Sequence, residues 1–240
     1  MPKLLSENDV AAYRDRGYHF PVDALSAGEV TDFRRRLEDY EAASGGPIKG
    51  EMRHRSHVLF TWINDMIRHP KILDAIEDLL GPNILCWNTS FFIKEAHDPG
   101  FVSWHQDATY WGLNSSDVAT AWIAMSPANK VSGCMKFIAG THKQQVQHED
   151  TFDQNNLLTR GQEIAVEVDE GGRRWCVARI PTATFNPNTS RSATSSRRPW
   201  PFTRKCRRNR SACFIAAPAR PPIARDASAP RLSVGASEGR

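Results

Sequence analysis

The chain has 240 residues, of which 40% are hydrophobic and 24% are charged, a balance typical of one soluble globular domain with a real core. No stretch approaches the roughly 18 uninterrupted apolar residues that cross a bilayer, and residues 1–7 lack the apolar core of a secretion signal. The five cysteines are scattered without CxxC spacing, which argues against a zinc site or a disulfide framework and predicts a reducing, cytoplasmic location.

The net charge of +4 conceals an asymmetry along the chain. Residues 171–240 hold 15 basic and 2 acidic residues, whereas residues 1–170 hold 16 basic and 25 acidic residues. The basic balance therefore belongs to the last 70 residues alone, and the body of the protein is acidic.

The first eighty residues predict helices. Ser6 is a candidate cap for a short helix that ends near Gly17, and Ser26 with Glu29 three residues later forms a capping box. A further apolar stripe at residues 72–80 stops at a Gly-Pro pair. Behind the capping box, apolar residues recur at helical spacing: Val30, Phe33, Leu37 and Tyr40.

The apolar period then changes to two. Residues 85–94, 119–125 and 164–169 alternate in a way that predicts half-buried strands, separated by turns rich in Gly, Pro and Asn. Helices followed by strands favour an α+β fold, here a double-stranded β-helix (jelly roll) with N-terminal helices.

From about Gly171 neither helical nor strand periodicity is visible, and Arg, Ser, Thr and Pro dominate. Low aromatic content and self-repelling charge predict a disordered segment. The expected organisation is a partial dioxygenase-like jelly-roll domain at 1–170, incomplete at its C-terminus, and a basic tail at 171–240.

The motif Ser103-Trp104-His105-Gln106-Asp107 carries the chemistry. In a strand, residues i and i+2 project from the same face, so His105 and Asp107 can bind one metal ion in adjacent positions. Imidazole and carboxylate, completed by a second histidine, form the facial triad of non-haem Fe(II) oxygenases. A His-x-Asp pair alone is weak evidence, because most such pairs are surface or core pairs.

Together with its neighbours, this motif resembles the phytanoyl-CoA dioxygenase family from about residue 4 to about residue 170. Several motifs in the family's order carry the resemblance: Tyr13–Tyr18, Phe91–Lys94, Trp104–Asp107, Thr120–Met125 and Ser132–His142. The resemblance implies Fe(II) as the metal and 2-oxoglutarate as co-substrate, with ascorbate as a further candidate. It also implies a small-molecule substrate.

By that resemblance, His105 and Asp107 are iron ligands, Lys94 and Trp122 lie near the co-substrate, and Trp111 shapes the substrate pocket. Each has a plainer interpretation. Lys94 fits a solvated strand edge, and the two tryptophans fit core aromatics. Among the remaining histidines, we expect His142 to be a structural turn residue. His54, His57 and His69 are expected at the surface of the helical region.

The sequence departs from the family at its C-terminal end. The family has a second metal-binding histidine on a late strand and an arginine that clamps the distal carboxylate of 2-oxoglutarate. Here no histidine follows His148. One hypothesis is that the tail is read in a shifted frame, because family-like sequence ends abruptly at Glu170. Resequencing that finds one uninterrupted frame, with close relatives carrying the same tail, would rule this out.

Three functions remain open on the sequence. The first is an oxygenase that couples decarboxylation of 2-oxoglutarate to succinate with hydroxylation of a C–H bond. The presence of Asp107 favours hydroxylation, because related halogenases carry a small residue there. The second is a remnant that folds in part and catalyses nothing. The third is nucleic-acid binding through the tail, which lacks aromatic interleaving and any known motif. We expect no membrane partner, and the sequence does not predict an oligomeric state.

Overall fold

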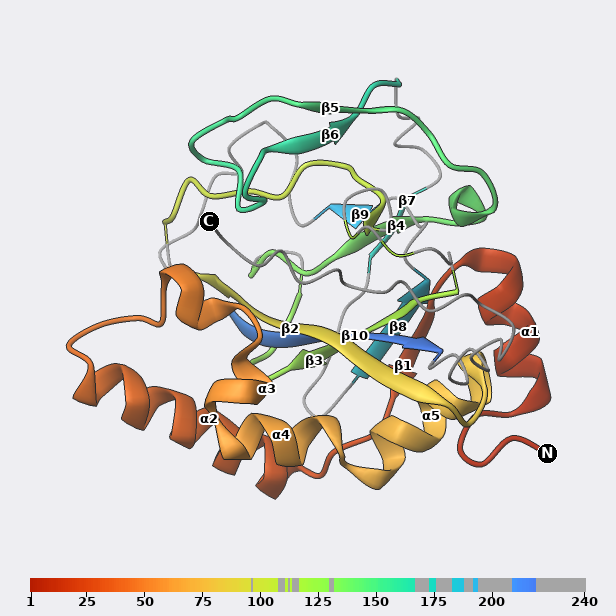
Figure 1. Ribbon diagram of the computed structural model, residues 1–240, viewed down its shortest axis with the longest axis horizontal. Helices are drawn as coiled ribbons and strands as arrows, with labels where there is room; N and C mark the ends of the chain where they lie inside the picture. Colours follow the sequence, from red (N-terminus) through yellow and green to blue (C-terminus); the bar gives the residue numbers. More distant parts are fainter. Residues whose placement is uncertain are drawn as a thin grey trace, which may run out of the picture.

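The computed structural model describes residues 1–95, 97–107, 111, 113, 117–129 and 132–166, followed by the backbone of four strands at 173–175, 183–187, 192–193 and 209–218. A five-stranded sheet lies across the middle of the molecule, with helices on one side and two small sheets on the other (Figure 1). Within the described residues no helix is long and apolar enough to span a membrane.

The two expected helix caps are confirmed. Ser6 begins α1 (Glu7–Arg16) and Ser26 begins α2 (Ala27–Ala43), each in a reciprocal capping box with the acidic residue three positions later. The apolar stripe at 72–80 lies in α5 (Pro70–Leu80). Shorter helical turns connect these elements: η1 (Gly50–Arg53), α3 (Ser56–Leu59) and α4 (Thr61–Ile67).

The five-stranded sheet is antiparallel and has the order β1-β8-β3-β10-β2. Its strands come from distant parts of the chain: β1 (His19–Val22), β2 (Ile84–Lys94), β3 (Ala119–Ala124), β8 (Ala183–Pro187) and β10 (Asn209–Pro218). Strand β10 pairs with β2 on one side and β3 on the other, so residues far along the chain join the centre of the sheet.

Two smaller sheets lie over the other face (Figure 1). One has the order β7-β4-β9 and the other pairs β5 with β6. Their bounds are β4 (Lys136–Ile138), β5 (His148–Asp150), β6 (Gln162–Ile164), β7 (Arg173–Trp175) and β9 (Ser192–Ala193). The short turn η3 (Thr141–Lys143) follows β4.

The two faces of the large sheet bury different clusters. Phe91, Ala121 and Ile123 face the helices and pack with apolar residues of α2, α4 and α5. Trp122 and Ala124 instead join a second cluster, with Phe137 of β4 and the half-buried Phe92 of β2. This second face of the large sheet is the one that looks toward the small sheets.

Three expectations about the early strands need correction. All six residues of β3 are buried, because a strand between two layers is covered on both faces. In β2 the register shifts between Cys86 and Asn88, and the resulting bulge leaves Trp87 39% exposed. The strand expected at 164–169 ends at Ile164; residues 165–166 are a bend and 167–170 lie outside the described residues.

The expectation of an irregular tail also differs from the structure at four segments, because β7, β8, β9 and β10 are strands. A strand that pairs on both sides is often a short continuous apolar run in the sequence and not an alternation, and residues 212–217 (Ala-Cys-Phe-Ile-Ala-Ala) are such a run. The remainder of 171–240 lies outside the described residues, so the boundary near residue 170 stays a prediction.

The place of β10 makes a truncation informative. A chain ending at residue 208 would lack the strand between β2 and β3, leaving two unpaired strand edges in the sheet. We expect this chain to aggregate or to lose cooperative unfolding, as measured by soluble yield and thermal denaturation. A chain ending at residue 220 retains β10 and serves as the control. Equal melting temperatures for the two chains would contradict the pairing and favour a folded part that ends earlier.

Candidate metal centre

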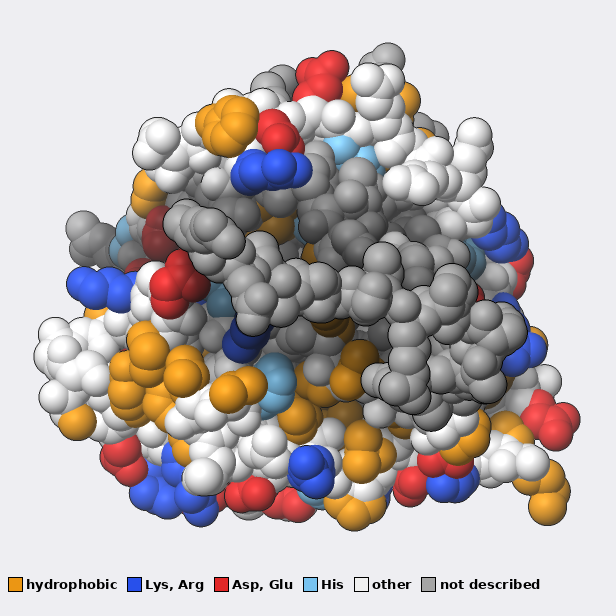
Figure 2. Space-filling model, in the orientation of Figure 1, with side chains coloured by type: hydrophobic (Ala, Val, Ile, Leu, Met, Phe, Trp, Pro, Cys, Tyr) orange, Lys and Arg blue, Asp and Glu red, His pale blue; other side chains and the backbone are white. Residues whose placement is uncertain are grey.

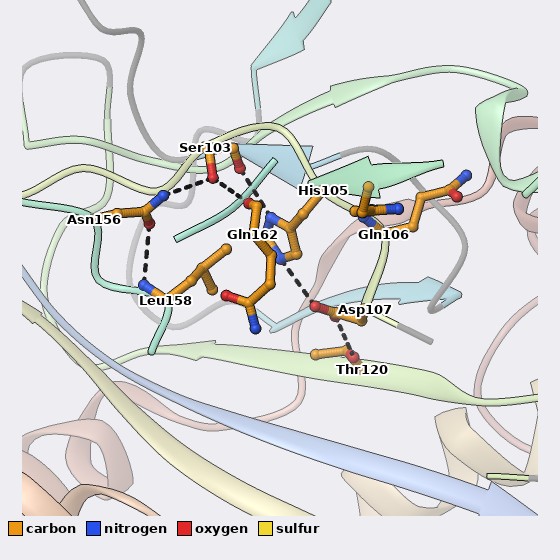
Figure 3. Close-up of polar contacts among 9 residues, drawn as sticks. Ser103, His105, Gln106, Asp107, Thr120, Asn156, Leu158 and Gln162 are labelled. Atoms are coloured by element: carbon orange, nitrogen blue, oxygen red, sulfur yellow. Dashed lines mark hydrogen bonds and ion pairs between the residues drawn. The ribbon is translucent and has the colours of Figure 1, made fainter. Parts of the chain in front are cut away.

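His105 and Asp107 point toward each other, as Figure 3 shows. The His105 Nε2 atom lies 2.9 Å from Asp107 Oδ1, and His105 Nδ1 lies 2.9 Å from the backbone oxygen of Ser103. The His105 residue is 7% exposed, whereas Asp107 is half-buried. The two side chains therefore share one side of the chain as expected, although residues 103–107 are not the expected strand but an irregular segment with a bend at Trp104 and an isolated bridge at His105.

These contacts define the tautomer of the imidazole. A carbonyl oxygen only accepts hydrogen bonds, so Nδ1 carries the proton that it donates to Ser103. A neutral ring then turns the lone pair of Nε2 toward the carboxylate, which also only accepts, whereas a protonated ring forms an ion pair with it. Two acceptors 2.9 Å apart repel each other unless a proton or a metal cation lies between them. A histidine whose other ring nitrogen donates to a carbonyl is the usual arrangement of a metal ligand.

The Asp107 carboxylate lies against the large sheet. The Thr120 hydroxyl of β3 lies 3.4 Å from Asp107 Oδ2 and donates toward it. Trp122, two residues along β3, projects from the same face and is 3% exposed. The pair thus lies on the sheet face that carries Thr120 and Trp122, in the space between the layers.

The segment that carries the pair is fixed from its opposite side. Gln106 is fully buried and points away from His105 (Figure 3). Its amide nitrogen donates to the backbone oxygens of Thr141 and Gln144, and its oxygen accepts from the amide of Val146. Its own backbone N–H donates to His148 Nε2 at 2.8 Å.

Ser103 anchors the same segment at its start. Its hydroxyl donates to the backbone oxygen of Gln162 at the beginning of β6, and it accepts from the side-chain amide of Asn156 (Figure 3). The backbone N–H of Ile164 donates to the carbonyl of Trp104 at 2.9 Å. Residues 103–106 are therefore bound by hydrogen bonds to the chain between η3 and β6.

Two other candidate residues, Lys94 and Trp111, come from β2 and from the segment before β3. Lys94 is half-buried at the end of β2, opposite Asn209 of β10. Trp111 is half-buried against Val118, and no described contact joins it to His105 or Asp107. Their roles near the co-substrate and the substrate stay predictions.

All eight histidines belong to the described residues, and none joins His105 and Asp107 in a group of three metal-binding side chains. His148 has both ring nitrogens in hydrogen bonds, Nε2 with Gln106 and Nδ1 with the backbone oxygen of Val146. His142 lies in η3 and donates from Nε2 to the carbonyl of Arg14 in α1, consistent with a structural turn residue.

The expectation of surface positions for three earlier histidines is wrong. His54, His57 and His69 are all half-buried. His54 contacts the Ser90 hydroxyl and His57 the Thr89 hydroxyl, both on β2. Burial lowers the pKa of His54 and of His57. Sequence reasoning placed them in a helical region but could not see that this region lies along the edge strand of the sheet.

Sequence reasoning also missed the residues that hold the pair in place: Ser103, Gln106, Thr120 and His148. The alternation of the motif contained one signal, because Gln106 between two inward-facing ligands must point the other way. The partners of Gln106 and Ser103 lie 35 or more residues away, so no local pattern reveals them.

The family model and the similar proteins point to one family. The family model described as phytanoyl-CoA dioxygenase (PhyH) matches residues 13–173. A probable alpha-ketoglutarate-dependent hypophosphite dioxygenase of Stutzerimonas stutzeri is 27% identical over 132 residues, covering 55% of this chain and 38% of that protein. The peroxisomal phytanoyl-CoA dioxygenase of Bos taurus is 34% identical over 86 residues, covering 34% of this chain and 25% of that protein. The chain thus matches well under half the length of these two relatives.

Solved structures share the fold. The apo form of the non-heme monooxygenase ThoJ has a TM-score of 0.72 and 25% identity, covering 87% of this chain and 76% of that chain. EctD from S. alaskensis, solved with 2-oxoglutarate and 5-hydroxyectoine, has a TM-score of 0.69 and 16% identity, covering 89% of this chain and 76% of that chain.

The buried amide of Gln106 provides a test of the site's support. Replacing Gln106 by Leu keeps the side chain's approximate size but leaves two carbonyls and one N–H of 141–146 without their partner. We expect the free energy of unfolding to fall by about 1–3 kcal/mol in urea denaturation, because buried polar groups lose their hydrogen bonds. The exposed Gln145 is the control, and Gln145→Leu should change little. Equal effects of the two substitutions would contradict the anchoring role.

Proposed function

Because this chain belongs to the phytanoyl-CoA dioxygenase family, we propose that it is an Fe(II)- and 2-oxoglutarate-dependent dioxygenase that hydroxylates a small organic molecule. The observation that carries the proposal is the contact between His105 Nε2 and Asp107 Oδ1, two acceptors that a metal cation would satisfy together. The proposed architecture is the jelly roll of its relatives, with the site between the large sheet and the small ones.

The donor set fits two of the three protein positions that Fe(II) takes in such sites. His105 would bind through Nε2, with Nδ1–H held by Ser103, and Asp107 would bind through a carboxylate oxygen next to Thr120. No second histidine joins the pair, since the other seven histidines of the chain lie elsewhere. A third protein ligand would have to come from another residue type or from outside the described residues.

Bound Fe(II) with 2-oxoglutarate supplies the oxidation, in which O2, 2-oxoglutarate and a C–H bond give succinate, CO2 and an alcohol. The residues of this chain provide the surroundings. His105 and Trp122 are buried, which would limit the access of water to a metal held by His105 and Asp107. Lys94 is proposed to offer its ammonium group to a carboxylate of 2-oxoglutarate, and Trp111 to line the substrate side.

A second candidate function is a folded relative that binds metal weakly and turns nothing over. The absence of a third ligand among the described His, Cys, Asp and Glu residues favours it. Loss of one metal ligand should cost more than the roughly 10–100-fold in affinity or activity typical of residues that only orient a ligand. The two candidates share the metal pair and differ in turnover.

Anaerobic titration with Fe(II) and 2-oxoglutarate tests both candidates. We expect a metal-to-ligand charge-transfer absorption band that develops at Fe(II) concentrations well above stoichiometric, because two protein ligands hold the metal less tightly than three. His105→Ala should abolish the band. Succinate formation on admitting O2 and ascorbate separates the two candidates, because turnover above that of His105→Ala supports the dioxygenase and turnover equal to it supports the inactive relative.

A matched control is His148→Ala, which removes a histidine near the motif whose ring nitrogens are both engaged in hydrogen bonds. This variant should retain the band. No band at any Fe(II) concentration would contradict the metal assignment. Succinate formation far above the His105→Ala level would contradict the second candidate and require a third ligand.

A further inference from the structure

A pocket of about 430 Å³ opens between η1 and the middle of β2. Its described lining consists of Glu51, His54, Arg55, Trp87 and Asn88. Its volume is within the range of small-molecule sites, which bury their ligands in clefts of roughly 300–1,000 Å³. Beside the grey atoms of the residues that are not described, Figure 2 shows hydrophobic, basic, acidic and histidine side chains mixed on the surface of the molecule. The pocket is thus large enough for an organic molecule and is lined mainly by polar and charged side chains.

The chain holds Arg55 at the pocket in a strained conformation. Its φ is 50°, in the left-handed region that residues other than glycine and asparagine seldom adopt. Its backbone N–H donates both to the carbonyl of Thr89 at 2.8 Å and to the side-chain oxygen of Asn88 at 3.1 Å. These bonds to β2 maintain the backbone conformation of Arg55, an exposed residue that lines the pocket. Strain of this kind concentrates where a ligand is bound.

The charges of the pocket do not satisfy each other. Glu51 and Arg55 both line it, yet within the described part of the chain neither side chain takes part in an ion pair or a hydrogen bond. His54 uses Nδ1 at the Ser90 hydroxyl, 3.1 Å away, which leaves Nε2 toward the pocket. The indole of Trp87, 39% exposed, offers a flat apolar surface beside the two charges. A cation, an anion and an aromatic ring therefore line one cavity without internal partners.

The pairing of the sheet places this pocket relative to the metal pair. Asn88 of β2 pairs with Ile215 of β10, and Ile215 pairs with Thr120 of β3. Residues paired across a sheet project from the same face, so Asn88 and Thr120 lie two strand spacings apart on one face, about 10 Å. The Thr120 hydroxyl lies against Asp107. Asn88 at the pocket and Thr120 beside Asp107 thus share one sheet face.

We infer that the pocket binds the substrate of the oxygenase by its two charges, and that this substrate is a small zwitterion of the amino-acid type. Its carboxylate pairs with the Arg55 guanidinium, its ammonium group lies at Glu51 and over the face of Trp87, and its body extends along the sheet toward Asp107. The inference rests on the proposed function for the step at the metal, but the binding itself needs no metal.

We expect the pocket to discriminate among ligands by the charged groups that they carry. A carboxylate on Arg55 makes a charge-assisted hydrogen bond, and the ammonium group gains both Glu51 and the indole face. A plain carboxylic acid would place its anion near Glu51 without an ammonium to offset the repulsion, and a plain amine would leave Arg55 unpaired. Each analogue that lacks one charge should therefore bind more weakly than the zwitterion.

Calorimetric titration of the metal-free full chain tests the inference. Two matched sets of probes are used, each an amino acid, an analogue without the ammonium group and an analogue without the carboxylate. The first set is phenylalanine, 3-phenylpropionate and phenylalaninamide, and the second is leucine, 4-methylpentanoate and leucinamide. We expect at least one amino acid to bind more tightly than both of its single-charge analogues. Arg55→Gln should weaken binding of that amino acid by about 10- to 100-fold, because a charge-assisted bond is lost. Glu51→Gln should remove most of its advantage over the carboxylic acid.

The exposed Arg68, at the end of α4 and not among the residues that line the pocket, provides the control; Arg68→Gln should leave every affinity unchanged. Binding of neither amino acid, tighter binding of the carboxylic acids, or equal losses in Arg55→Gln and Arg68→Gln would each overturn the inference. Failure of the proposed function has another signature, since the zwitterion would then bind while no charge-transfer band forms with Fe(II) and 2-oxoglutarate. If the band forms but the zwitterion does not bind, the pocket alone is wrongly assigned.

Discussion

The alternation of side chains along residues 103–107 is the constraint on which the site depends. His105 and Asp107 project toward the large sheet, and Gln106 between them projects into the loop at 141–146. One short segment therefore presents two metal-binding groups on one side and secures itself on the other. The Ser103 carbonyl adds the second requirement, because it orients the ring so that Nε2 meets the carboxylate. Three consecutive side-chain directions and one backbone carbonyl thus determine a site that would otherwise need several separate elements.

The large sheet gives this segment its surroundings. Strand β10 lies between β2 and β3 and sets them in register, which brings Ser90 and Trp122 into one row and Asn88 and Thr120 into the next. Because Thr120 contacts Asp107 and Asn88 lines the pocket at Arg55, both the metal pair and the pocket depend on the same register. The late part of the chain, unlike the family in its composition, supplies the strand that aligns them.

The sequence predicts the local features well and the long-range ones poorly. Capping boxes at Ser6 and Ser26, the stripe of α5, and the strands β2 and β3 all follow from patterns within a few residues. The His105–Asp107 pairing also follows, because it needs only a spacing of two. Strand β10 was missed because a central strand shows no alternation, and the role of Gln106 was missed because its partners lie 35 to 40 residues away. The bulge at Trp87 is visible only in the pairing of β2 with β10.

The central claim is that a metal cation lies between His105 and Asp107, and diffraction from crystals of the full chain soaked in Mn(II) tests it most directly. An anomalous difference map at the manganese edge should show a peak within bonding distance, about 2.0–2.3 Å, of His105 Nε2 and of an Asp107 carboxylate oxygen. Adjacent ligands at such bond lengths lie about 3 Å apart, so the 2.9 Å separation of Nε2 and Oδ1 should change little when the metal binds. A map without a peak, in which the imidazole and the carboxylate keep their direct contact, would contradict the account.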